Sequence, residues 1–189
     1  MNNATVVIMT GPPASGKTTL RRALAARLGM PFLYKDGIKE TLFDTLGWSD
    51  REWSRKLGVA TYELLFHWLE MELAARRSLV VESNFDSQRD GSRFLALRDR
   101  YGFRPVQVCC VTHGAVLLER FRSRAASEER HPGHVETVNI AEFEQALLRG
   151  RINSLPLDGP VIEVDTTDFA QVDVEAIVRE VLAAIGAES

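Results

Sequence analysis

Short apolar runs alternate along the chain with stretches in which apolar residues recur every three or four positions. Five of the runs are continuous and apolar, as in strands that are buried on both faces of a parallel sheet. These runs are residues 5–10, 31–35, 79–83, 106–112 and 161–164. Because helical stretches separate them, the pattern predicts an α/β fold in which helices cover both faces of a five-stranded parallel sheet.

The helical stretches carry their own boundary signals. Leu20, Leu24 and Leu28 recur at four-residue spacing, which places them on one helix face. Ser49 and Glu52 form a capping-box pattern that predicts the start of a long helix, and Gly58 is a point where that helix could break. We expect helices over residues 17–28, 37–47, 50–77, 89–101, 115–126, 142–148 and 172–185. The polar segment 127–136 is expected to be a mobile loop.

The first predicted strand leads directly into a glycine motif. Residues 11–18 read G-P-P-A-S-G-K-T and match the pattern G-x-x-x-x-G-K-[ST] at every fixed position. In such a loop the glycines permit a tight turn, and the backbone N–H groups converge on phosphate oxygens. Lys17 would place its charge on the β- and γ-phosphates, and Thr18 would offer its hydroxyl to Mg²⁺. The predicted nucleotide contacts are Gly11, Pro12, Pro13, Ala14, Ser15, Gly16, Lys17, Thr18 and Thr19.

Composition narrows the class of protein further. A chain of 189 residues fits one compact domain, and a net charge of -3 argues against a surface devoted to nucleic acid. Cys109 and Cys110 are adjacent in an apolar strand, so we expect buried free thiols in a reducing compartment. With no leader pattern and no apolar stretch of about 20 residues, the sequence predicts a cytoplasmic protein without a membrane segment.

Other classes of P-loop protein fit the sequence less well than a small kinase. A regulatory GTPase should carry a guanine-reading N-K-x-D, which is absent from the sequence. Two D-x-x-G matches, at residues 44–47 and 99–102, fall at predicted helix ends, where glycine is an ordinary stop signal. The third strand ends in Glu82-Ser83-Asn84 rather than in the Asp-Glu of a large mechanical ATPase.

Polar residues that follow the second and third strands are candidates for the acceptor side of the site. Ligands of a parallel α/β sheet bind beyond the carboxyl ends of the strands, so Asp36, Glu82 and Asn84 should face the glycine motif. Asp36 could accept the proton of an attacking hydroxyl or hold a magnesium-bound water, and equally it could cap the next helix. Glu82 could organise magnesium-bound water or bind substrate, and Asn84 could contact an acceptor or lie in a turn before a helix capped by Asp86 or Ser87.

Arginines in the fifth predicted helix indicate a lid. Arg120 and Arg124 share one helix face, whereas Arg122 points away. The pair could grip ATP phosphates or stack on adenine, and the alternative is a solvated arginine face paired with Glu119 and Glu128. His131 and His134 follow in R-H-P-G-H, and two ligands are too few for a zinc site, so we expect loop contacts from them.

Taken in chain order, these elements resemble one group of proteins. The glycine motif, Asp36, the E-S-N-F at 82–85, the Arg120/Arg124 pair and R-H-P-G-H are similar to the P-loop kinases of the zeta toxin and polynucleotide kinase-like group, often described only as AAA-type ATP-binding proteins. The resemblance covers nearly the whole chain. It implies a three-layer P-loop NTPase fold, a single kinase domain over residues 1–189 and a helical lid at approximately 115–138.

The resemblance also implies an activity, namely ATP- and magnesium-dependent transfer of the γ-phosphate to a hydroxyl. In the polynucleotide kinases and chloramphenicol phosphotransferase an aspartate after the second strand is the general base, which maps onto Asp36. Two lid arginines of the polynucleotide kinases contact ATP, which maps onto Arg120 and Arg124. Many relatives have Asp-Thr-Asn where this chain has Glu82-Ser83-Asn84, so their substrate contacts do not transfer directly.

Three functions follow from these features. The favoured one is a kinase for a small molecule, such as a nucleoside, a sugar or an antibiotic. The second is a 5′-hydroxyl polynucleotide kinase, made less favourable by the net charge and by the lack of a fused phosphatase or ligase domain. The third is a nucleotide-dependent regulatory ATPase without an acceptor. The sequence predicts neither the acceptor nor the oligomeric state.

Overall fold

One parallel sheet of five strands forms the centre of the computed structural model, which describes residues 3–127, 130–135 and 140–186. The strands follow the order β2-β3-β1-β4-β5, so that β1 lies in the middle between β3 and β4. Their bounds are Thr5–Thr10 for β1, Phe32–Tyr34 for β2, Leu79–Glu82 for β3, Arg104–Val111 for β4 and Val161–Asp165 for β5. The predicted five-stranded parallel sheet is confirmed.

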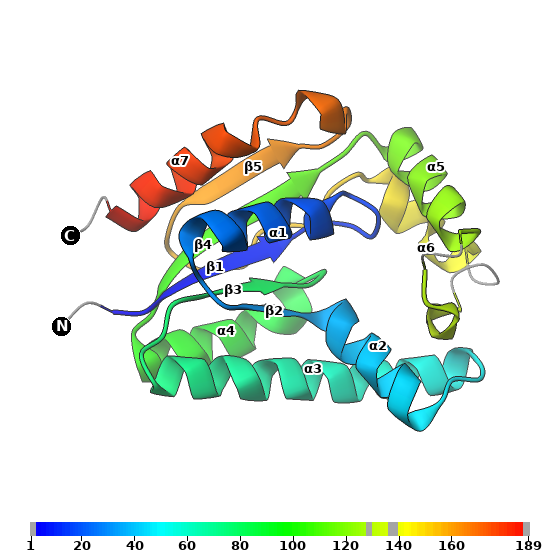
Figure 1. Ribbon diagram of the computed structural model, residues 1–189, viewed down its shortest axis with the longest axis horizontal. Coiled ribbons are helices and arrows are strands. Elements are labelled where there is room, and N and C mark those ends of the chain that lie inside the picture. Colours follow the sequence, from blue (N-terminus) through cyan, green and yellow to red (C-terminus); the bar gives the residue numbers. More distant parts are fainter. Residues whose placement is uncertain (1–2, 128–129, 136–139, 187–189) are drawn as a thin grey trace.

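Helices cover both faces of this sheet (Figure 1). α1 and α7 pack together on one face, and α3 and α4 pack on the other. Further helices, α2, α5 and α6, gather at the end of the sheet to which the strands point. The helices are α1 (Lys17–Leu28), α2 (Lys35–Leu46), α3 (Arg51–Ala74), α4 (Ser87–Tyr101), α5 (Gly114–Ala125), α6 (Ile140–Leu148) and α7 (Val174–Gly186), with the short 3-10 turns η1 (Pro132–His134) and η2 (Phe169–Gln171).

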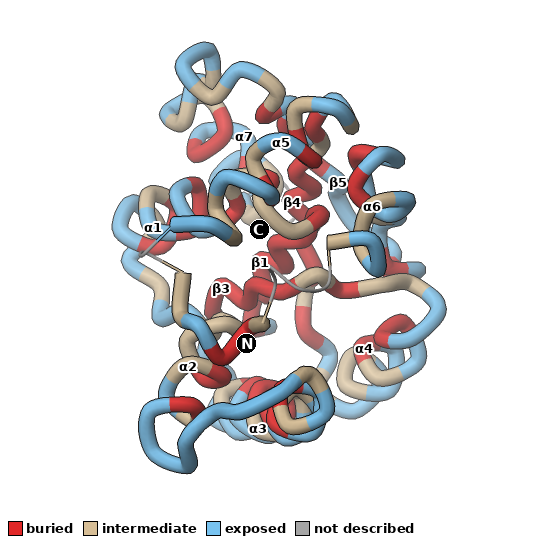
Figure 2. The backbone as a smooth tube through the Cα atoms, turned by 90° about the vertical axis from the view of Figure 1, so that its right-hand side faces the viewer, coloured by how far each residue is buried: buried red, intermediate tan, exposed pale blue. Residues whose placement is uncertain are grey.

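The core follows from the alternation of side chains along each strand. In β1, Val6 and Ile8 pack against α3 and α4, whereas Val7 and Met9 pack against α1 and α7. All six residues of β1 are buried, which is why its sequence reads as a continuous apolar run. Figure 2 shows the central strands as the buried interior of the molecule.

Several predicted boundaries are wrong by a few residues. α2 begins at Lys35 rather than near Gly37, its N-cap is Tyr34, and Asp36 lies within the first turn, so the interpretation of Asp36 as an N-cap is wrong. The N-cap of α3 is Asp50, one residue after Ser49, the N-cap that the capping-box pattern predicts. The side chain of Asp50 accepts a hydrogen bond from the N–H of Trp53. α7 begins two residues later than expected, after the turn η2.

Gly58 does not break α3, which runs unbroken for 24 residues. A glycine inside a helix costs only about 1 kcal/mol relative to alanine, and α3 buries a continuous stripe that includes Leu65, Leu69 and Leu73. A Cβ at Gly58 would lie 3.8 Å from Nζ of Lys39, an ordinary van der Waals contact, so the packing around α3 does not require a glycine there.

Two further expectations concern the thiols and membranes. Cys109 and Cys110 are both buried free cysteines, as predicted, and burial raises the pKa of Cys110 to about 12. Both thiols are therefore protonated at neutral pH and unreactive.

Within the described ranges, each helix is too short or too polar to cross a membrane.

Candidate active site

The loop between β1 and α1 takes a shape that depends on two glycines. Gly11 has φ of +151° and Gly16 has φ of +81°, values that side-chain-bearing residues rarely adopt. A Cβ on Gly11 would lie 2.7 Å from the carbonyl oxygen of Cys110, and one on Gly16 would lie 2.7 Å from the ring of Phe169. The two glycines of the motif are thus required by backbone angle and by space together.

Lys17 lies against this loop at the start of α1. Its Nζ donates hydrogen bonds to the carbonyl oxygens of Gly11, at 2.9 Å, and Pro12, at 2.7 Å. Burial lowers the pKa of Lys17, and the nearby carboxylate of Glu82 opposes that shift. Thr18 follows as an exposed residue of the same cavity wall, so its hydroxyl is accessible to a ligand.

A cavity of about 630 Å³ opens beyond the carboxyl ends of the strands. One wall is the loop from Pro13 to Thr19, and the opposite wall comes from α2 and the end of β3. All the side chains predicted at the acceptor side or in the lid line it, namely Asp36, Glu82, Asn84, Arg120 and Arg124. Gly11 and Pro12 belong to the same loop but do not line the cavity, and their carbonyl groups accept the hydrogen bonds of Lys17.

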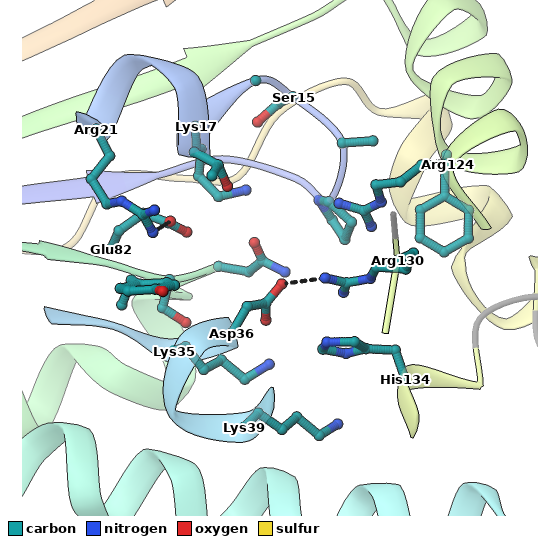
Figure 3. A pocket seen from close by; sticks show the side chains of 18 of the residues that line it. Ser15, Lys17, Arg21, Lys35, Asp36, Lys39, Glu82, Arg124, Arg130 and His134 are labelled. Atoms are coloured by element: carbon teal, nitrogen blue, oxygen red, sulfur yellow. Dashed lines mark hydrogen bonds and ion pairs between the residues drawn. The ribbon is translucent and has the colours of Figure 1, made fainter. Parts of the chain in front are cut away.

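Asp36 faces the cavity from the first turn of α2, and its carboxylate meets Arg130 (Figure 3). Nη1 of Arg130 donates to Oδ2 of Asp36 at 2.9 Å. Burial alone would raise the pKa of Asp36, but the charges of Arg130 and Lys35 outweigh it and hold the pKa well below its usual range. Asp36 is therefore an ionised carboxylate at neutral pH.

Glu82 is held at the tip of β3 by a buried ion pair. Nη1 of Arg21 donates to Oε2 of Glu82 at 3.0 Å, and the Arg21 guanidinium stacks over the ring of Tyr34 at 3.7 Å. Burial raises the pKa of Glu82, with Lys17 opposing the shift. Tyr34 in turn covers Gly37, where a Cβ would lie 2.1 Å from its ring. This chain of contacts fixes the start of α2 and thereby the position of Asp36.

A second network supports the turn after β3. The hydroxyls of Ser83 and Tyr62 are 3.0 Å apart, and Nη2 of Arg89 donates to the Tyr62 hydroxyl at 2.8 Å and to the backbone carbonyl of Asn84 at 3.1 Å. Burial raises the pKa of Tyr62 to about 12. Asp86 caps α4 through the N–H groups of Gln88 and Arg89, which confirms one of the two caps expected there.

The two predicted lid arginines differ in what they contact. Arg120 donates to the carbonyl oxygens of Thr166, at 2.7 Å, and Thr167, at 2.8 Å, and so ties α5 to the end of β5. Arg124 lies across the cavity from Asp36 (Figure 3), and its charge helps to lower the pKa of Lys17. Arg122 pairs with Glu144 at 3.3 Å on a different face of α5, as its position in the helix predicts.

Residues 130–135 are docked on α2, so the expectation of a mobile loop is wrong for this part of it. Nε2 of His134 lies 2.9 Å from Oε1 of Glu40, and Nε2 of His131 lies 3.2 Å from Oδ1 of Asp44. Gly133 lies so close to the ring of Phe43 that a Cβ there would approach to 2.7 Å. Residues 128, 129 and 136 of the expected loop lie outside the described residues. Both histidines make the predicted loop contacts, and the described residues contain no cluster of three metal-binding side chains.

Sequence reasoning missed the basic lining of the cavity. Lys35 and Lys39 flank Asp36 on α2, Arg51 enters from α3, and Arg130 reaches in from the docked segment. Lysines four residues apart beside a candidate base were visible in the sequence. Arg51 and Arg130 become neighbours of the site only through packing.

The fold and the site together are those of a P-loop kinase, the class of ATP-dependent phosphotransferases. The chain belongs to a family of AAA domains, whose model matches residues 6–149. It is 43% identical to a proposed kinase from Chloroflexus aurantiacus, with 97% of this chain and 99% of that chain covered and a TM-score of 0.87.

More distant relatives extend this comparison. A sugar kinase from Janibacter shares the fold at 18% identity, with a TM-score of 0.55 and 97% of this chain and 95% of that chain covered. A cytidylate kinase from Ignicoccus hospitalis is 32% identical over 81 residues, which is 42% of this chain and 47% of that protein. The chain therefore spans about half the length of this curated relative.

Proposed function

We propose that this protein transfers the γ-phosphate of ATP to a hydroxyl group of a small molecule. The observation that carries the proposal is that Lys17 with its glycine loop and Asp36 line opposite walls of one cavity. Phosphoryl transfer needs the donor phosphate and the acceptor hydroxyl in line, with positive charge around them. The cavity supports this proposal, because lysine and arginine side chains line it and its volume is typical of small-molecule sites.

Each predicted residue receives a role in this proposal. The backbone N–H groups of residues 14–19 bind the phosphates, because Pro12 and Pro13 have no N–H to donate. Lys17 leaves the carbonyls of Gly11 and Pro12 to bind the β- and γ-phosphates. Arg124 and Arg120 close over the nucleotide from α5, and Glu82 and Asn84 bound the acceptor subsite. We further propose that residues 1–189 form one kinase domain, with residues 115–138 as its lid.

Asp36 acts as the base in this scheme. A carboxylate with a depressed pKa is a weak base, but phosphoryl transfer depends mainly on orienting the hydroxyl, and its proton leaves late. The acceptor hydroxyl then replaces Arg130 as the hydrogen-bond partner of the Asp36 carboxylate. Arg130, which lines the same cavity, then accompanies the transferred phosphate in this scheme.

The residues present fit a magnesium ion delivered with the nucleotide. Mg²⁺ usually takes only one or two protein oxygens, with phosphates and waters completing the shell. The exposed Thr18 hydroxyl would be the direct ligand, and Asp36 and Glu82, which line the same cavity, would hold its waters. The ion would neutralise phosphate charge during transfer.

The zeta toxin and polynucleotide kinase-like group remains our proposal for the branch of the family. An ADP-release assay with Mg²⁺ and ATP, run against nucleosides, sugars and antibiotics, tests the function. We expect a large stimulation by one acceptor class. Labelling of 5′-hydroxyl oligonucleotides with radioactive ATP would instead support a polynucleotide kinase. Slow ADP release that responds to neither set of acceptors contradicts the kinase proposal.

A further inference from the structure

Positive charge dominates the cavity well beyond the glycine loop. Nine lysine and arginine side chains line it, against three carboxylates. Three of the four lysines in the sequence are among them, namely Lys17, Lys35 and Lys39. Only Lys17 belongs to the glycine loop, whereas Lys35 and Lys39 come from the opposite wall, on α2 (Figure 3).

The three carboxylates of the cavity are already used by other partners. Glu82 pairs with Arg21, and Asp36 and Glu40 pair with Arg130 at 2.9 and 3.4 Å. Arg51 pairs with Glu142 outside the lining, but that carboxylate is shared with Arg55. The acceptor wall therefore carries more positive charge than its own carboxylates neutralise.

Lys39 is the clearest case of a cation without an anionic partner. The residue is only 6% exposed, and among the described residues its Nζ has no carboxylate within ion-pair distance. Its hydrogen bond goes to the hydroxyl of Ser54, at 2.9 Å, which leaves two N–H donors of the ammonium group. Burial and the neighbouring charge of Lys35 lower the pKa of Lys39 to about 8. A buried ammonium in this state is costly unless an anion joins it.

The nucleotide does not supply that anion. A magnesium–ATP complex carries about two net negative charges, and its phosphates lie in the glycine loop beside Lys17. Lys35 and Lys39 lie on the far side of Asp36 from that loop (Figure 3), and Arg51, whose charge acts on Lys39, lines the same cavity. Their charge is directed at the space where the acceptor must lie.

We propose that the phosphate acceptor carries an anionic group, a carboxylate or a phosphate ester, which binds between Lys35, Lys39 and Arg51. This inference rests on the proposed kinase function and adds the substrate class. Asp36 and Lys39 are separated by about one helical turn, on the order of 5 Å along the axis. A molecule that meets both therefore has its hydroxyl and its anion only a few bonds apart, as in a small hydroxy acid or a phosphorylated polyol.

Calorimetry on the nucleotide complex tests the inference. The protein is first saturated with Mg²⁺ and a non-hydrolysable ATP analogue, so that the glycine loop is filled, and is then titrated with malonate or with inorganic phosphate. We expect the wild type to bind at least one of these anions, Lys39→Met to bind it at least tenfold more weakly, and Lys39→Arg to retain most of the affinity. Lys56→Met is the matched control, because Lys56 is the remaining lysine and is exposed on α3.

The possible results distinguish the inference of an anionic acceptor from the proposed kinase function. Binding of malonate alone assigns a carboxylate, and binding of phosphate alone assigns a phosphate ester. Anions that fail to bind the wild-type complex, or that bind Lys39→Met as tightly as the wild type, overturn the inference. An ADP-release assay with hydroxy acids and phosphorylated sugars beside their uncharged counterparts checks the result without any variant. If only uncharged acceptors are phosphorylated, the inference is wrong and the kinase function stands. If the ATP analogue itself does not bind, the kinase function fails and the inference fails with it.

Discussion

The two walls of the cavity are built in different ways. The wall that we propose for the nucleotide is one uninterrupted segment, residues 13–19, whose shape follows from Gly11, Gly16 and the start of a helix. The acceptor wall is assembled from α2, α3, the end of β3 and the docked segment 130–135. A wall made by one segment can be recognised from a short sequence motif. A wall made by several elements depends on how those elements pack, which a short motif does not show. This difference explains why the sequence predicts where the phosphate donor binds and leaves the acceptor open.

The largest expected effect lies on the nucleotide wall. Lys17→Ala removes the charge that meets the β- and γ-phosphates, so we expect phosphate transfer to fall on the order of 10³-fold or more, with weaker ATP binding. Steady-state ADP release and calorimetry with ATP and Mg²⁺ measure the two effects, and Lys56→Ala serves as the control. Full activity of Lys17→Ala would show that the glycine loop is not the donor site.

The corresponding change on the acceptor wall separates binding from chemistry. Asp36→Asn keeps the size of the side chain and removes its charge, so we expect transfer to fall roughly 10²- to 10⁴-fold while ATP binding is retained. Single-turnover transfer and nucleotide calorimetry provide the comparison, with the exposed Asp99→Asn as the control. Wild-type transfer by Asp36→Asn would remove Asp36 from the mechanism.

The buried ion pair between Arg21 and Glu82, which joins α1 to the end of β3, should contribute to the free energy of unfolding. Arg21→Met leaves Glu82 buried without its cation, which costs about 3–5 kcal/mol for pairs of this kind. Urea unfolding measures this loss, and we expect the double variant Arg21→Met with Glu82→Gln to recover part of it. If the double variant is no more stable than Arg21→Met, the ion pair is not what holds β3 to α1.

The smallest effect concerns the unbalanced charge of the acceptor wall. The pKa of Lys39 is about 8 in the folded protein, below its ordinary value of 10.5, so the fold disfavours the charged lysine. That cost is present below pH 8 and is relieved as the pH rises towards 10.5, so the wild type should gain stability relative to Lys39→Met between pH 7 and pH 9.5. Thermal unfolding of both proteins at the two pH values measures the difference, and a constant difference would contradict it. The polar and charged groups around Lys39 are Lys35, Asp36, Ser54, Arg51, Arg130 and His134.

Sequence and structure agree where the cause is local. Continuous apolar runs predicted the sheet because a strand that is buried on both faces needs apolar residues at successive positions. The position of Asp36 could be predicted because the carboxyl ends of parallel strands meet at one edge of the sheet. The sequence did not show that Glu82 pairs with Arg21, that Arg120 binds the end of β5 or that residues 130–135 dock on α2. Those contacts join residues between 46 and 94 positions apart. No periodicity within one element can reveal such pairings.

The ring of Phe169 against Gly16 has a consequence for how the protein is made. The ring fills the space beside the glycine, yet it arrives in the turn that follows the last strand of the sheet. The N-terminal part of a nascent chain leaves the ribosome first. The glycine loop therefore forms before Phe169, which is synthesised 153 residues after Gly16, can pack against it. Nascent chains that stop before β5 should therefore bind ATP poorly, and nucleotide capture would mark the moment when synthesis has passed that turn.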